Sequence, residues 1–226
     1  MRAALEVDAG DYYWSACISV VDGLRAVDAE FFTWSTVKMY YAVFYALRAL
    51  LAWDGVTVFH VGTTPYWAKA TAGAFPVWVP GIGTHQAVLA CFRTLNPNSD
   101  FVTQPIEFAD DGLAWMLEKR EDANYNVSRF SEPAIPGYYA SIAKLGVRKA
   151  VGAYLDPKSG VTPFDKDHAV VAFPIAVLAA AAAAANARGG AIVSEDELAF
   201  LKRKCRERDA ALSPVSRLIA GSFKTA

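Results

Sequence analysis

Cysteine and histidine are scarce in this chain of 226 residues, and neither sign of charge is in excess. The three cysteines, Cys17, Cys91 and Cys205, lie far apart and form no CxxC pair, which argues against a disulfide framework and a cysteine metal site. The 22 lysines and arginines are balanced by 23 aspartates and glutamates. Because phosphate binding needs concentrated positive charge, any nucleic-acid site must be local.

Motifs of common enzyme classes are also missing. The chain has no HExxH sequence and no Walker motif, and its histidines, His60, His85 and His168, fall on separate predicted elements. We therefore expect no metal and no cofactor. The N-terminus turns acidic before an apolar stretch can develop, which is wrong for a secretory signal and favours a cytoplasmic location.

Apolar residues in a helical pattern are abundant. They make up 54% of the chain, which is typical of a core-forming protein and excludes a disordered one. They recur at spacings of three and four almost throughout. The expected helices cover residues 9–28, 33–54, 84–95, 110–130, 138–155, 169–187 and 194–212, with a short last helix after residue 213. The predicted fold class is all-α.

One stretch, residues 55–83, departs from this pattern. It concentrates glycine and proline around short β-prone runs, so it is predicted to be a loop or small hairpin inserted between helices. Residues 1–132 are expected to form a helical bundle that contains this insertion. Residues 133–226 are expected to form a helical extension packed on the bundle.

Residues 169–187 carry no charge, and a helix that spans a membrane needs about 20 mostly apolar residues. Most of this segment is alanine, however, and alanine contributes little insertion free energy compared with larger apolar residues. The composition therefore favours a buried, closely packed helix over a membrane span, and no contact with a membrane is expected.

The helix expected at 33–54 is apolar nearly all round, so its few polar residues are informative. Lys38, Tyr41, Tyr45 and Arg48 fall on one helix face. They could line an anion pocket for a nucleotide phosphate, with arginine supplying a bidentate fork. Alternatively, the two cations pair across the helix packing with acidic residues drawn from Asp111, Glu118, Glu121 and Asp122.

Residues 38–51 (KMYYAVFYALRALL) resemble the tyrosine-rich central helix of the HEPN superfamily, the helical nucleotide-binding domain of prokaryotic toxin and defence proteins. Two further stretches follow in the order of that family. Residues 84–88 (THQAV) resemble the start of its third helix, and residues 120–125 (REDANY) resemble the Arg-x-x-Ala-Asp-Tyr signature of its small stand-alone members. The resemblance covers residues 9–132 and implies a HEPN-like helical bundle that forms a homodimer.

Active members of the family form a metal-independent ribonuclease site where two protomers bring together an Arg-x4-6-His motif. The resemblance places the arginine at Arg120, with Asn124 nearby, but Tyr125 stands where a histidine is required. Because tyrosine has a pKa of about 10 and histidine of about 6.5, catalysis is expected to be degenerate. If cleavage survives, Arg120 would stabilise the phosphorane charge, and Tyr125, His60 or His85 would move the proton.

Several of these residues also have structural interpretations. Arg120 and Asn124 could form a hydrogen-bonded pair within the bundle, since residues four apart share a helix face. A basic cluster could grip an RNA backbone or form a solvated helix face: Lys202, Arg203, Lys204, Arg206 and Arg208. The insertion contains four aromatic residues with a single lysine beside them: Tyr66, Trp67, Phe75 and Trp78. Surfaces that stack bases normally lie beside a basic groove, so a dimer contact or a flap that covers the bundle is favoured here and base stacking is not.

Two classes of function follow from the resemblance. The first is a non-catalytic, HEPN-like dimerising module of bacterial stress or anti-phage defence. It would bind RNA, a nucleotide or a partner protein, such as a cognate antitoxin or a defence-complex protein. The alternative is a metal-independent endoribonuclease, a toxin or effector that uses Arg120. The residues expected to contact RNA or nucleotide are Lys38, Tyr41, Tyr45, Arg48 and His85.

Overall fold

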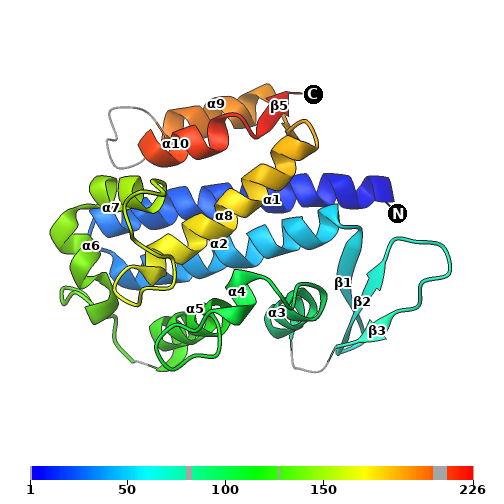
Figure 1. Ribbon diagram of the computed structural model, residues 1–226, viewed down its shortest axis with the longest axis horizontal. Helices are drawn as coiled ribbons and strands as arrows, with labels where there is room; N and C mark the ends of the chain where they lie inside the picture. Colours follow the sequence, from blue (N-terminus) through cyan, green and yellow to red (C-terminus); the bar gives the residue numbers. More distant parts are fainter. Residues whose placement is uncertain (1, 80–82, 127, 206–212, 226) are drawn as a thin grey trace.

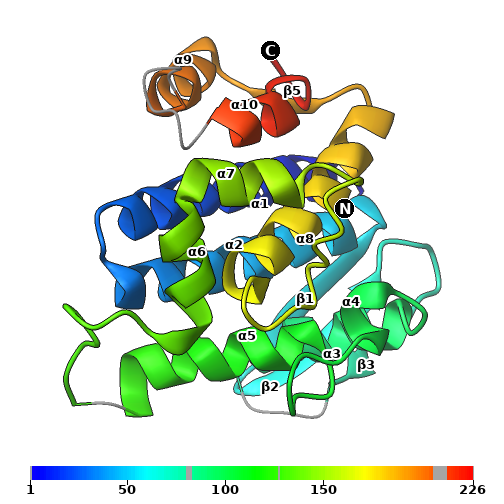
Figure 2. The ribbon, with the colours of Figure 1, turned by 60° about the vertical axis from the view of Figure 1, so that its left-hand side comes forward.

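Three long helices form the centre of the protein. The structure, a computed structural model, describes residues 2–79, 83–126, 128–205 and 213–225. In it, α1 (Arg2–Asp28) and α2 (Phe32–Trp53) form an antiparallel pair, and α8 (Ala169–Ala187) lies across that pair (Figures 1 and 2). Most apolar residues of the three helices belong to one continuous core.

The remaining helices cover this centre from two sides and one end. On one side lie α3 (Thr84–Leu95), the short α4 (Asp100–Thr103) and α5 (Gly112–Glu121), which continues into a π-helical turn, η1 (Asp122–Asn126). On the opposite side lie α9 (Glu195–Lys204) and α10 (Ser213–Ala220). The 3₁₀ turn η2 (Gly137–Tyr139), α6 (Ala140–Leu145) and α7 (Val147–Tyr154) close one end (Figure 2).

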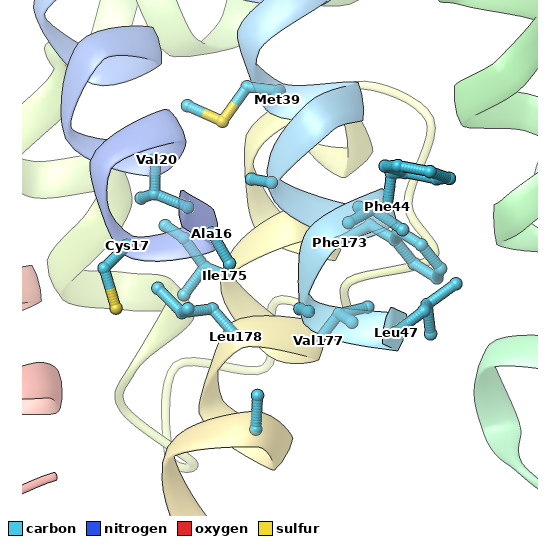
Figure 3. Packing of buried hydrophobic residues seen from close by; sticks show 14 of the residues in the cluster. Ala16, Cys17, Val20, Met39, Phe44, Leu47, Phe173, Ile175, Val177 and Leu178 are labelled. Carbon is cyan, nitrogen blue, oxygen red and sulfur yellow. The ribbon is translucent and has the colours of Figure 1, made fainter. Parts of the chain in front are cut away.

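The interface of α1, α2 and α8 is packed with interdigitating apolar side chains, among them Val20, Leu47 and Leu178 (Figure 3). Close approach of the helices depends on small residues. A Cβ added at Gly23 of α1 would lie 2.9 Å from the Met39 Cε of α2. The alanines of α8 let its backbone approach its neighbours in the same way, which is why a helix with so few large side chains can occupy the core.

By length and composition alone, α8 is apolar enough to cross a membrane. In this fold, 67% of its apolar window is buried inside the protein, against α1 and α2. The structure therefore places α8 as the core helix that its alanine content predicts.

Two small sheets complete the fold. In the first, β1 (Val56–Val61), β2 (Thr64–Lys69) and β3 (Val77–Trp78) pair antiparallel in the order β1-β2-β3, within the insertion. In the second, β4 (Ala191–Val193) pairs parallel with β5 (Phe223–Thr225).

The second sheet ties the C-terminal segment to α1. The hydroxyl group of Ser222, just before β5, forms a buried hydrogen bond with the Tyr13 hydroxyl of α1. The ring of Phe223 stacks on the ring of Tyr13, with their centroids 5.0 Å apart. Because the Tyr13 ring also lies 5.7 Å from the Trp53 ring of α2, between centroids, this contact joins the C-terminal segment to the α1–α2 pair.

The predicted all-α class is therefore wrong: the protein is helix-rich but contains a three-stranded and a two-stranded sheet. The β-branched and aromatic residues of β1 and β2 pair across a tight turn at Gly62, and this pairing extends to a third strand. The strands β4 and β5 have three residues each, and residues 194–222 separate them in the sequence. No local sequence pattern could therefore predict that they pair.

Several helix boundaries also differ from expectation. The helix predicted at 138–155 is interrupted at Gly146, where a φ of +85° ends α6 and starts α7. The first helix begins at Arg2 instead of residue 9, and the helix predicted at 110–130 leaves α-helical geometry after Glu121. The predicted end of the helix at 194–212 lies outside the described residues. The expected extension, residues 133–226, supplies α8 to the same core as α1 and α2.

Candidate functional site

A narrow stripe of α2 remains open along a helix that is otherwise mostly buried. Its members are spaced three or four residues apart and are exposed or half-buried: Trp34, Lys38, Tyr41, Tyr45 and Arg48. Four of these are the residues that the sequence places on one helix face. The rings of Tyr41 and Tyr45 stack along the stripe, with centroids 5.9 Å apart and planes tilted by 28°.

The guanidinium of Arg120, at the end of α5, lies against this stripe. Its Cζ atom is 5.6 Å from the ring centroid of Tyr40, the buried residue beside Tyr41. Burial acts to lower the pKa of Arg120, but a hydrogen bond with Tyr41 and the nearby Tyr125 hydroxyl raise that pKa above its ordinary value. The guanidinium therefore stays charged among aromatic rings, in a geometry suited to cation–π attraction.

Tyr125 reaches Arg120 because of the π-helical turn η1. In an α-helix, residues five apart point about 140° away from each other. The wider winding of η1, with its i→i+5 hydrogen bonds, turns Tyr125 back over Arg120 instead. Nη2 of Arg120 donates a 3.3 Å hydrogen bond to the Tyr125 hydroxyl, and Tyr125 itself is 69% exposed.

His85, in the first turn of α3, completes one side of the site. Its Nδ1 lies 2.9 Å from the Tyr40 hydroxyl, and its ring is 4.4 Å from the Phe44 ring and 5.6 Å from the Tyr41 ring, between centroids. Burial lowers the pKa of His85, and the positive charges of Arg120 and Arg48 lower it further. The imidazole is therefore favoured in its neutral form.

Arg48 forms the other end of the site. Its guanidinium lies over the ring of Tyr12 on α1, with Cζ 3.9 Å from the ring centroid, and it donates a short hydrogen bond to the Tyr12 hydroxyl. Burial raises the pKa of Tyr12; Arg48 opposes that rise, whereas Asp8 and Asp11 add to it. Two carboxylates thus lie near this end without forming an ion pair with Arg48 among the described residues.

We use the name α2 groove for a set of residues joined by ring contacts and hydrogen bonds along the open stripe of α2, without implying a cavity: Tyr41, Tyr45, Arg48, His85, Arg120 and Tyr125. Within the part of the chain that the structure describes, neither guanidinium of the groove forms an ion pair with a carboxylate. The Nε atom of Arg120 is buried and has no hydrogen-bond partner in the same part of the chain. A buried donor without a partner costs free energy.

Lys38 does not share this character. Its Nζ is 3.2 Å from a carboxylate oxygen of Asp22 on α1. The acidic partners expected across the packing are also not those observed, because Asp111 instead accepts two hydrogen bonds from Arg93, at 2.6 and 2.8 Å. Lys38 therefore has a carboxylate partner, whereas Arg48 has none among the described residues.

The other candidate residues lie outside the α2 groove. Asn124 is half-buried on η1. In a regular α-helix it would lie beside Arg120, but here Tyr125 forms the hydrogen bond with Arg120. His60 is exposed near the tip of the β1–β2 hairpin, opposite Pro65. No group of residues suited to hold a metal ion occurs in the described ranges. Of the basic cluster, Lys202, Arg203 and Lys204 lie on α9, whereas Arg206 and Arg208 lie outside the described residues.

Two residues of the site escaped the sequence reasoning. Neither Tyr40 nor Tyr12 belongs to the site that the sequence predicts. A hydroxyl on an otherwise apolar, buried helix face is a usable signal, because buried hydroxyls seek partners. The partners found are His85 for Tyr40 and Arg48 for Tyr12.

No family model matches the chain, and no curated protein or solved structure matches it either. A function must therefore be argued from the residues of the α2 groove, their charges and their partners. The chemistry available there is cationic and aromatic, with one imidazole favoured in its neutral form.

Proposed function

We propose that the α2 groove binds the phosphate groups and bases of RNA or of a nucleotide. The observation that carries this proposal is the pair of arginines, Arg48 and Arg120, that lie on tyrosine rings without carboxylate partners in the described chain. Arginine pairs with phosphate through parallel hydrogen bonds from its guanidinium nitrogens. The exposed Tyr125 and the stacked pair Tyr41–Tyr45 offer ring faces to bases.

The biological role proposed with this site is that of a HEPN-like dimerising module in bacterial stress or anti-phage defence. The support is the resemblance of residues 38–51, 84–88 and 120–125, whose side chains meet in the groove. Dimer formation through this face would double the number of guanidinium groups. A partner protein, such as an antitoxin, would act by covering the same groove.

Binding of a fluorescein-labelled oligouridine, followed by anisotropy at several salt concentrations, tests the proposal. Arg120→Ala should weaken binding about 10- to 100-fold, the loss expected for a hydrogen bond to a charged group. It should also reduce the salt dependence by about one phosphate contact. Arg48→Ala should behave in the same way.

Arg188→Ala is the matched control. Arg188 also lies over an aromatic ring, 5.7 Å from that of Trp53, but it is paired with Asp54 at 3.5 Å. This variant should bind like the wild type. Equal losses in the Arg188 and Arg120 variants would show that the effect is general charge and would contradict a site in the groove.

A second candidate function is metal-independent RNA cleavage, and the position of His85 favours it. The motif histidine is absent, but the imidazole of His85 lies in the groove with a lowered pKa, and Nδ1 contacts the Tyr40 hydroxyl. Nε2 is the remaining nitrogen that could take a proton from a 2′-hydroxyl, while Arg120 stabilises the charge on phosphorus-bound oxygens.

Cleavage of a labelled RNA in the presence of a chelator separates the two functions. If the protein is an endoribonuclease, the wild type should give cleavage products, and these should be absent in both His85→Ala and Arg120→Ala. If it is a binding module, the RNA should stay intact in every sample and its affinity should depend on Arg120.

A further inference from the structure

An apolar cleft opens at the end of the molecule where the turn between α1 and α2 lies beside α6 (Figures 1 and 2). Its volume is about 450 Å³, which is within the range of small-molecule sites in proteins. Buried apolar side chains from α1, α2, α6 and α7 form its floor: Val27, Phe32, Ile142 and Val147. Within the described chain, the lining of this cleft shares no residue with the α2 groove.

Three charged residues, Asp28, Glu30 and Lys144, line the same cleft. Asp28 is the last residue of α1, Glu30 follows it in the turn, and both are exposed. Lys144 lies in the last turn of α6. Among the described residues, neither carboxylate forms an ion pair with Lys144 or with another cation. Both carboxylates can therefore take a cation from outside the chain.

The two carboxylates stand at the end of α1 where negative charge is least favourable. The carbonyl groups at a helix C-terminus carry partial negative charge, so a cation is preferred there. Arg25, the basic residue of this last turn, donates a 2.7 Å hydrogen bond to the Lys204 carbonyl, beside α9. A cation that entered the cleft would be stabilised by the helix end and by both carboxylates.

Glu30 also has a backbone conformation that favours glycine, with a φ of +61°. It ends α1 in a Schellman motif, in which the Glu30 amide donates to the Val27 carbonyl at 3.0 Å. The Phe31 amide donates to the Ala26 carbonyl at 2.7 Å in the same motif. Glycine is the usual residue at this place, so a glutamate there costs stability. Strain of this kind is concentrated at functional sites, and Glu30 lines the cleft.

We propose that this cleft binds a small organic ammonium ion, a primary amine with an apolar body. The ammonium group lies between Asp28 and Glu30, and the apolar body covers Phe32 and Ile142. An anion is disfavoured, because two carboxylates face one lysine. A neutral apolar molecule would leave both carboxylates without a partner. The site is independent of the function proposed for the α2 groove.

The test compares three probes of equal chain length: n-hexylamine, 1-hexanol and 1,6-hexanediamine. Hexylamine is protonated at pH 7, because its ordinary pKa is near that of lysine, about 10.4. In an NMR chemical-shift titration it should bind saturably, with a Kd on the order of 1 mM. Hexanol lacks the charge and should bind more weakly. The diamine should also bind more weakly than hexylamine, because its second ammonium group would lie on the apolar floor.

The charge of the lining is tested by substitution. Glu30→Gln should weaken hexylamine binding about two- to fivefold, the loss expected for one exposed ion pair. The double variant Asp28→Asn/Glu30→Gln should bind hexylamine no better than hexanol. Lys144→Met should strengthen hexylamine binding, since a like charge is removed from the lining. Asp110→Asn is the matched control, because Asp110 is an exposed residue outside the cleft, and it should bind like the wild type.

Glu30→Gly separates the charge of this residue from its backbone strain. The substitution should raise the midpoint of thermal denaturation by about 2–4 °C, because glycine relieves the strain. It should also weaken hexylamine binding as much as Glu30→Gln does. A residue that served only to end α1 would change the midpoint and leave the affinity unaltered, which would contradict the proposal.

Four further results would overturn the proposal. Hexanol that binds as tightly as hexylamine would show that the carboxylates take no part. A diamine that binds more tightly than hexylamine would reduce the site to an acidic surface. Hexylamine affinity that survives in the double variant, or that falls equally in Asp110→Asn, would place the amine elsewhere.

Discussion

The guanidinium carbon of Arg120 lies 5.0 Å from the ring centroid of Tyr125, five residues later in the chain, and the two side chains share a hydrogen bond. This contact joins the two residues that the resemblance aligns with the arginine and the histidine of a ribonuclease motif. The π-helical turn η1 brings the side chain at position 125 within hydrogen-bond distance of the Arg120 guanidinium. Tyrosine, unlike histidine, does not ordinarily exchange protons near neutral pH.

Tyr125→His should therefore create metal-independent RNA cleavage. An imidazole beside Arg120 would supply acid–base catalysis, which typically contributes about 10²- to 10⁴-fold in rate. The measurement is the cleavage of labelled RNA with a chelator present. Tyr125→Phe serves as the control and should show no gain, since it removes the hydroxyl without adding a base. A Tyr125→His protein that binds RNA but never cleaves it would count against the motif alignment.

The pKa of His85 should rise towards its ordinary value near 6.5 when Arg120 is replaced by glutamine, since one of the charges that lower it is then removed. NMR titration of the imidazole carbon measures this directly, and the His168 signals provide an internal control that the substitution should not alter. Addition of oligouridine to the wild type should also raise the His85 pKa, because bound phosphate stabilises the imidazolium. If the pKa of His85 responds to neither change, the guanidinium of Arg120 does not lie beside the imidazole when the protein is in solution.

The same shift gives a pH dependence of stability. A histidine whose pKa is lowered in the folded state binds its proton more readily in the unfolded chain. The contribution of His85 to the free energy of unfolding is therefore fully present above pH 6.5. It falls as the pH drops below that value, until the folded-state pKa is passed. Urea denaturation from pH 8 to pH 5 should show a smaller loss in His85→Gln than in the wild type.

Gly112→Ala should destabilise the fold by about 2–3 kcal/mol, the cost of forcing an extra group into a packed core. A Cβ at Gly112 would overlap the Phe173 ring of α8, with Cζ at 2.6 Å, where α5 meets the core. Gly152→Ala in α7 is the matched control, since its Cβ would meet nothing within 4 Å. That variant should gain up to about 1 kcal/mol from helix propensity. Thermal denaturation of both proteins measures the difference, and equal midpoints would contradict the packing described.

Asp111→Ala should cost about 2–4 kcal/mol. The carboxylate caps α5 by accepting a 2.7 Å hydrogen bond from the Ala114 amide, and it also holds Arg93 through two hydrogen bonds. The neighbouring Asp110 is exposed, so Asp110→Ala should change the free energy of unfolding by less than about 0.5 kcal/mol. Urea titrations of the two variants test the contrast. A similar loss in both would assign the effect to net charge instead of the cap.

The sequence predicted the helices with strong apolar periodicity but misplaced several of their ends, such as the break at Gly146. The core helices α2 and α8 follow from local pattern. The start of α9 also has a local signal, because Ser194 and Glu197 form a capping box there. The strands β4 and β5 could not be predicted in this way, because three residues pair with three others far along the chain. The all-α class failed for this reason and because the insertion forms a sheet.

Much of the candidate site was predictable, but the carboxylate partners of its cations were not. Helical spacing alone places Tyr41, Tyr45 and Arg48 on one face. Whether a cation on that face has a carboxylate partner depends on how α1 packs beside α2. That packing pairs Lys38 with Asp22 and leaves Arg48 on an aromatic ring. The π-helical turn was likewise invisible, since its residues carry no distinctive pattern.

The attachment of Ser222 and Phe223 to Tyr13 has a consequence during synthesis on the ribosome. Roughly 200 further residues must be translated after α1 before the segment that packs against Tyr13 exists. At elongation speeds of about 5–20 residues per second this delay is on the order of 10–40 s. For that interval the nascent chain would expose the apolar surface around Tyr13, and a chaperone that shields emerging helices would be needed most at that stage.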